Sequence, residues 1–196
     1  MRSIKGLTHV AGDIRNLARN LLAQGVSAEA LTRTIAALND ALTREVLNRV
    51  LQNHDLEGLK WCWLALGSEG RGEQTLATDQ DNALIFAAPA EASDVHRARQ
   101  GLLAFARDVN AALDELGFPL CKGNIMASNP QWCLTETEWR DQFTSWIREP
   151  TPERLLNANI FFDFRPLYGE AALGERLRDW LLARTQDNKL FLRLMV

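Results

Sequence analysis

Residues 67–82, GSEGRGEQTLATDQDN, decide the fold of this chain. An apolar run, Trp61 to Leu66, leads into this stretch, and a second apolar run, Ala83 to Ala88, follows it. Both runs have the length and the bulky composition of short buried strands. The sequence therefore predicts a strand, a glycine-rich turn, one helical turn, and a second strand that opens with two aspartates.

The residue types in this stretch suit a phosphate and a divalent cation. Asp79 and Asp81 are two positions apart, so on an extended chain both carboxylates point to one face, where they can hold a hard cation such as Mg²⁺. Gly67 and Ser68, at the start of the helical turn, offer backbone N–H groups and a hydroxyl to a phosphate. Ser68 can equally serve as a helix N-cap, because capping uses the same geometry. A phosphate cradle beside an acid pair is typical of phosphoryl or nucleotidyl transfer.

Three segments carry a resemblance to a known superfamily. Gly67, Ser68, Arg71 and the Asp79-x-Asp81 pair resemble the signature of the polymerase beta-type nucleotidyltransferases. The longer string LGSEGRGEQTLATDQDNALIF resembles a bacterial branch often found downstream of cyclic-nucleotide-binding and CBS domains. That branch is similar to the catalytic domain of the uridylyltransferases that modify the nitrogen regulator PII. The strings CKGNIMASNPQW and FFDFRPLYG extend the resemblance over most of the chain.

The resemblance implies a metal-dependent enzyme that moves a nucleoside monophosphate from a nucleoside triphosphate to an acceptor hydroxyl, here on a signalling protein. Asp79 and Asp81 would hold Mg²⁺ or Mn²⁺, while Gly67, Ser68 and Gly70 would cradle the phosphates. It also implies associated CBS or cyclic-nucleotide-binding regulatory domains, and a further helical segment after residue 196.

Two more side chains have alternative roles. Arg71 can contact phosphate, or it can brace the turn by pairing with Glu69 or Glu73. The resemblance implies a third catalytic carboxylate, for which Asp163 is the best remaining acid. Asp163 can instead form an ion pair with Arg165 inside the fold.

The expected third strand, Phe118 to Met126, has no acid at Lys122-Gly123-Asn124. If Asp163 is structural too, the chain is better described as a regulatory nucleotide-binding module without catalysis. A third alternative is a metal-dependent glycosyltransferase, since those enzymes also use an Asp-x-Asp. The upstream Gly-Ser turn and the lack of a Rossmann-like glycine fingerprint argue against it.

Composition excludes several other classes of protein. The 196 residues are 46% hydrophobic and 24% charged, which is ordinary for a globular domain. A formal net charge of −3 gives no general attraction to nucleic acid or to an anionic membrane. No apolar run has the length of a membrane span. The three cysteines, Cys62, Cys121 and Cys133, show no metal-ligand spacing, which indicates reduced thiols in a cytoplasmic protein.

Hydrophobic periodicity completes an α+β prediction. Apolar residues at three- and four-residue steps predict two long helices, about 4–24 and 27–52, joined as a hairpin. We therefore divide the chain into a helical hairpin, 1–57, and a nucleotidyltransferase-like domain, 58–196, built on a small mixed sheet with flanking helices. Ser93 is the expected N-cap of the helix that ends at Gly117. The segment Leu155 to Phe164 fits either a buried helix or a strand.

Overall fold

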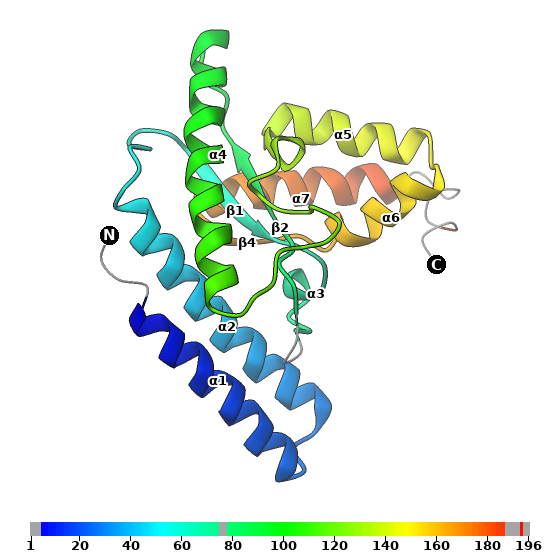
Figure 1. The fold of residues 1–196 in the computed structure, drawn as a ribbon. Coiled ribbons are helices and arrows are strands. Elements are labelled where there is room, and N and C mark those ends of the chain that lie inside the picture. The colour runs from blue at the N-terminus through cyan, green and yellow to red at the C-terminus, as the bar shows by residue number, and fades with distance from the viewer. Residues whose placement is uncertain (1–4, 75–77, 187–192, 194–196) are drawn as a thin grey trace.

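The computed structural model describes residues 5–74, 78–186 and 193, and a four-stranded sheet lies at its centre (Figure 1). The strand order is β3-β2-β1-β4. β1 pairs antiparallel with β2 and with β4, whereas β2 and β3 are parallel. This mixed sheet among many helices is the predicted α+β fold. The strand bounds are Trp61–Ala65 for β1, Asn82–Phe86 for β2, Cys133–Thr135 for β3 and Arg165–Gly169 for β4.

The central strands β1 and β2 carry apolar side chains on both faces of the sheet, so helices pack against both faces. Along β1, Trp61 and Trp63 join one hydrophobic cluster, while the alternating Cys62 and Leu64 join the other. The first cluster is completed by α1, α2 and α4, and the second by α5, α6 and α7. The helix bounds are Lys5–Ala23 for α1, Ala28–Leu51 for α2, Ala92–Glu115 for α4, Glu136–Arg148 for α5, Pro152–Phe161 for α6 and Ala171–Gln186 for α7.

The N-terminal helical hairpin forms as predicted and packs against the sheet. Ser27 caps α2 by accepting a hydrogen bond from the N–H of Ala30. Val46 and Leu47 of α2 are fully buried in the same cluster as Trp63. The division of the chain at residues 57 and 58 stays a prediction. Among the described helices, none is both long enough and apolar enough to cross a membrane.

The prediction of a third strand over 118–126 is wrong. This segment is a loop whose backbone makes only isolated bonds to the start of β2, such as Asn82 N to Ile125 O at 3.2 Å. Asn124 has a positive φ of 55°, which an extended strand does not allow. The third strand is instead β3, which is only three residues long.

Two other local predictions are decided by the structure. The ambiguous segment Leu155 to Phe164 is mostly helix, because α6 ends at Phe161 and the strand β4 begins only at Arg165. Ser93 is not an N-cap, since α4 already begins at Ala92 and Glu91 occupies the cap position.

Candidate functional site

The glycine-rich turn and the aspartates meet at one end of the sheet. The turn contains a short helix, α3, Gly67–Gly70, which directly follows β1. Because β1 and β2 are antiparallel, Ala65 at the end of β1 pairs with Asn82 at the start of β2. The N–H of Leu66 donates to the carbonyl oxygen of Asp81 at 3.0 Å. The predicted phosphate-binding turn and acid pair are therefore adjacent in space.

Gly67 lies directly against the carboxylate of Asp81. Its φ is +51°, a left-handed conformation that favours glycine, and a Cβ built on it would lie 3.1 Å from Asp81 Oδ2. Any larger residue at position 67 would strain the backbone and press on this carboxylate.

The two aspartates interact through their charges. Asp79 is exposed, whereas Asp81 is partly buried. Burial raises the pKa of the Asp81 carboxyl, and the negative charge of Asp79 raises it further, while a hydrogen bond with the Cys121 thiol opposes the shift. A divalent cation between the two groups would relieve both the burial penalty and the repulsion. The acid pair therefore fits a hard cation with oxygen ligands.

A buried amide network, which was not predicted from the sequence, holds the start of β2. Asn110 of α4 donates to Gln80 Oε1 at 2.7 Å and to Asn82 Oδ1 at 3.1 Å. Gln80 also donates to the carbonyl of Phe118 at 2.8 Å, and Asn82 accepts from the N–H of Ala127 at 2.8 Å. Because both neighbours of Asp81 are fixed in this way, its backbone is held in place. The polar character of two buried positions flanking Asp81 was the only available signal.

Ser68 lies within α3 and is not its N-cap, so the capping alternative is wrong. The cap position is Leu66, which provides no side-chain bond. In the first turn of any helix, the N–H groups have no acceptor within the helix, and here they belong to Gly67, Ser68 and Glu69. The Ser68 hydroxyl has no hydrogen-bond partner among the described residues. These N–H groups and the hydroxyl are available to an oxyanion.

Arg71 connects the turn to the segment that follows α6. Its Nε donates to Glu73 Oε2 at 2.8 Å, and its Nη1 donates to Asp163 Oδ2 at 3.0 Å. All three side chains are at least 40% exposed, so this is a surface network. The predicted brace between Arg71 and Glu73 is present. The alternative in which Asp163 pairs with Arg165 is wrong, because Asp163 pairs with Arg71 and Arg165 pairs with a different acid.

Arg165 pairs instead with Asp40 of α2, beneath the glycine-rich turn. Its two terminal nitrogens contact the two Asp40 oxygens at 2.9 and 3.0 Å, and Nη2 also donates to the carbonyl of Glu69 at 3.0 Å. The Glu69 side chain is buried near this pair. Burial raises the pKa of Glu69 to about 8, with Asp40 and Asp81 adding to the rise and Arg165 opposing it.

Asp163 comes close to α3 mainly through its backbone. A Cβ on Gly70 would collide with the carbonyl oxygen of Asp163, so glycine at position 70 allows this contact. Across residues 5–74, 78–186 and 193, no three His, Cys, Asp or Glu side chains gather in a way that could hold a metal ion. In this conformation the Asp163 carboxylate therefore does not join Asp79 and Asp81.

A family model described as "Putative nucleotidyltransferase DUF294" matches residues 12–153. The chain belongs to this family. The matched region contains the whole glycine-rich turn and both aspartates, and it ends before Asp163. The DUF294 family is named for nucleotidyl transfer, a reaction that uses a nucleoside triphosphate. A search of curated proteins found no match to the chain.

Proposed function

We propose that this DUF294 protein transfers a nucleoside monophosphate from a nucleoside triphosphate to an acceptor hydroxyl, with Asp79 and Asp81 as ligands of Mg²⁺ or Mn²⁺. The observation that carries the proposal is the contact between Asp81 and Gly67, which puts the acid pair directly beside the open N–H groups of α3. Phosphate oxygens bound at α3 would be within reach of a cation held by the aspartates.

Each part of the site has a defined task in this proposal. The N–H groups of Gly67 and Ser68, together with the Ser68 hydroxyl, bind the β- and γ-phosphate oxygens. A bound Mg²⁺ supplies charge neutralisation at the triphosphate and at the leaving pyrophosphate. Arg71 is exposed and lies beside this turn, so it can exchange an acidic partner for a phosphate.

Asp163 is the proposed acceptor of the proton from the attacking hydroxyl. Its side chain is 47% exposed and is anchored at the edge of α3 by Arg71. The acceptor hydroxyl is proposed to belong to a signalling protein, and the support for this is the resemblance to the PII uridylyltransferases.

A second candidate, a nucleotide-binding regulatory module without catalysis, is favoured by one observation. Within the described part of the chain, no third acid accompanies Asp79 and Asp81, and the Asp163 carboxylate is engaged by Arg71. Such a module would bind the triphosphate with its metal but transfer nothing.

The acid pair is tested by replacing both carboxylates with amides. Mg²⁺ with a nucleoside triphosphate should raise the melting temperature of the wild type by ligand linkage. Asp79→Asn with Asp81→Asn should abolish that rise and leave the apo protein folded. The matched control is Asp141→Asn with Asp179→Asn, which makes the same charge change at two exposed helical positions. An unchanged rise in the Asp79/Asp81 variant would contradict the proposed site.

A further inference from the structure

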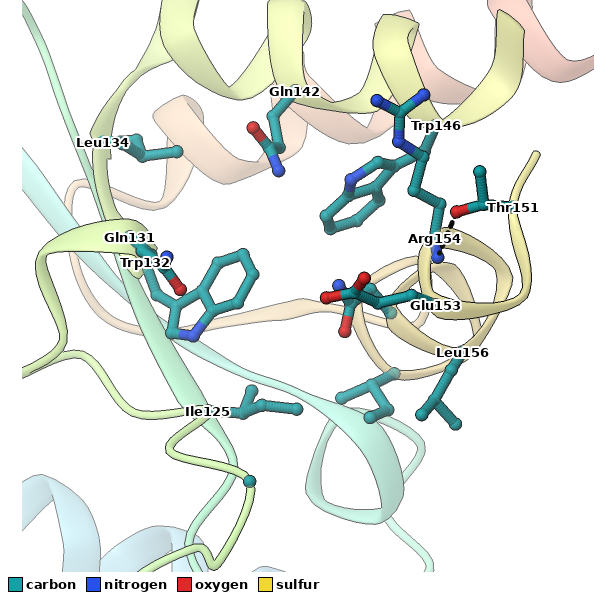
Figure 2. A pocket seen from close by; sticks show the side chains of 13 residues that line it. Ile125, Gln131, Trp132, Leu134, Gln142, Trp146, Thr151, Glu153, Arg154 and Leu156 are labelled. Carbon is teal, nitrogen blue, oxygen red and sulfur yellow. Dashed lines mark hydrogen bonds between the residues drawn. The ribbon is translucent and has the colours of Figure 1, made fainter. Parts of the chain in front are cut away.

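A pocket of about 600 Å³ opens among loops and helices of the second half of the chain (Figure 2). It lies between α5, α6 and the short helix η1, Pro130–Trp132, which precedes β3. Its volume is within the range of small-molecule sites. None of the residues that have a role in the proposed nucleotidyl transfer lines this pocket.

The pocket borders the acid pair. A Cβ built on Gly67 would lie 3.8 Å from Cγ2 of Ile160, which lines the pocket, and 3.1 Å from Asp81 Oδ2. Ile125, also in the lining, accepts the N–H of Asn82, the residue after Asp81. A ligand with phosphates at α3 would therefore have one wall of this pocket beside it.

The chemistry of the walls suits a flat, uncharged, hydrogen-bonding group. Trp132 and Trp146 contact each other edge to face in the pocket wall, with ring centroids 6.3 Å apart, and the amide of Gln142 reaches into the open space from α5 (Figure 2). Asn157 of α6 adds a second amide. Neither the Gln142 nor the Asn157 side chain has a hydrogen-bond partner among the described residues. Unpaired amide groups beside an aromatic wall can form hydrogen bonds with the edge of a heteroaromatic ring.

The charge of the lining argues against phosphate as the occupant. Its ionisable side chains are one acid and one base, Glu153 and Arg154. The guanidinium of Arg154 is already bonded to Glu149 Oε2 at 2.7 Å and to the carbonyl oxygen of Glu149 at 3.0 Å. The pocket thus has no free cationic group to attract an anion.

We propose that this pocket binds the nucleobase of the nucleoside triphosphate, with Gln142 and Asn157 as the side chains that select the base. The inference rests on the proposed function, because the acid pair and α3 hold the triphosphate that leads into the pocket. A protein acceptor would instead need a broad surface, since specific protein interfaces bury about 800 Å² on each partner.

The two halves of the ligand are tested separately. The probes are Mg²⁺ complexes of ATP, GTP, CTP and UTP, the Mg²⁺ complex of tripolyphosphate, and the four nucleosides, measured by calorimetry and by tryptophan fluorescence. The variants are Gln142→Leu and Asn157→Leu. The matched control is Asn159→Leu, which makes the same change at an exposed position of α6 outside the pocket. Because Gln142 and Asn157 are only partly buried, we expect all three variants to melt like the wild type.

At least one nucleoside triphosphate should bind more tightly than tripolyphosphate. Gln142→Leu and Asn157→Leu should each weaken that binding by about tenfold, the effect of roughly one lost hydrogen bond. Both variants should bind tripolyphosphate like the wild type, and Asn159→Leu should change neither affinity. If the wild type and both pocket variants bind the nucleoside triphosphates with equal affinity, the inference is overturned.

Failure of the pocket and failure of the proposed function give different results. If tripolyphosphate binds and Asp79→Asn with Asp81→Asn abolishes its binding, the phosphate site stands; a lack of any preference for nucleoside triphosphates then overturns only the pocket. If the aspartate variant binds tripolyphosphate normally, the proposed metal site fails. Nucleoside binding that Gln142→Leu weakens would still support the pocket in that case.

Discussion

Arg165 forms a two-pronged ion pair with Asp40, which lies 125 positions earlier in the chain. The two side chains are 29% and 13% exposed. The same guanidinium donates to the carbonyl of Glu69, so one arginine connects the helical hairpin, the start of β4 and the glycine-rich turn. The position of the turn therefore depends on a contact between two segments that are far apart in the sequence.

Removal of Asp40 should destabilise the fold and loosen the turn. Asp40→Ala leaves Arg165 without its partner in a mostly buried position, which typically costs about 3–5 kcal/mol of unfolding free energy. The measurement is urea denaturation. The control is Glu29→Ala, whose partner Arg33 lies with it on the exposed face of the same helix, and this change should cost less than about 1 kcal/mol. Equal effects of the two substitutions would contradict a stabilising role for the Asp40–Arg165 pair.

Asp163→Ala should have little effect on stability, because its ion pair with Arg71 is exposed to solvent; we expect a loss of under about 1 kcal/mol. Glu73→Ala removes the other acidic partner of Arg71 and is the matched control. If Asp163 accepts the proton of the attacking hydroxyl, only Asp163→Ala should abolish transfer of a labelled nucleotide while nucleotide affinity is kept. Equal transfer by both variants would remove Asp163 from the catalytic role, whereas a wild type that binds the nucleotide but transfers nothing would favour the regulatory module.

Glu69 should make the stability of the apo protein depend on pH. Its pKa is about 8 in the folded state and about 4.5 when unperturbed. The folded state therefore binds the proton more tightly, and the resulting stabilisation is complete below pH 4.5 and is lost as the pH rises through about 8. Without added metal, the unfolding free energy of the wild type should fall over this window more steeply than that of Glu69→Gln. Parallel curves for the two proteins would contradict a buried, neutral Glu69.

Substitutions at two glycines of the turn distinguish the effect of backbone strain from the effect of displacing Asp81. Gly67 and Gly72 both have positive φ, but a Cβ on Gly72 would meet nothing within 4 Å. Gly72→Ala should cost about 1 kcal/mol of stability from strain alone and leave the binding of Mg²⁺ with tripolyphosphate unchanged. Gly67→Ala should carry the same strain and also displace Asp81, which weakens this binding by about tenfold. The comparison is calorimetric titration, and equal affinities would show that the phosphates lie elsewhere.

Local sequence patterns were sufficient for the elements that determine the site's outline. The apolar runs on either side of residues 67–82 predict β1 and β2, and both strands form. The Thr135–Glu138 spacing predicts a capping box, which is present at the start of α5. Such features are encoded within a few residues of one another, through side-chain periodicity and capping geometry.

The sequence by itself determined the strand–turn–strand unit, the glycines and the acid pair, because these depend on neighbours along the chain. Only the tertiary structure decided that Asp163 pairs with Arg71 and that Arg165 pairs with Asp40, since no periodicity links residues 92 or 125 positions apart. It also decided the third strand, because three residues are too few to show an alternating pattern and β3 exists only by pairing with β2. The partners of a charged side chain are set by which segments the hydrophobic core brings together, and that is a property of the whole fold.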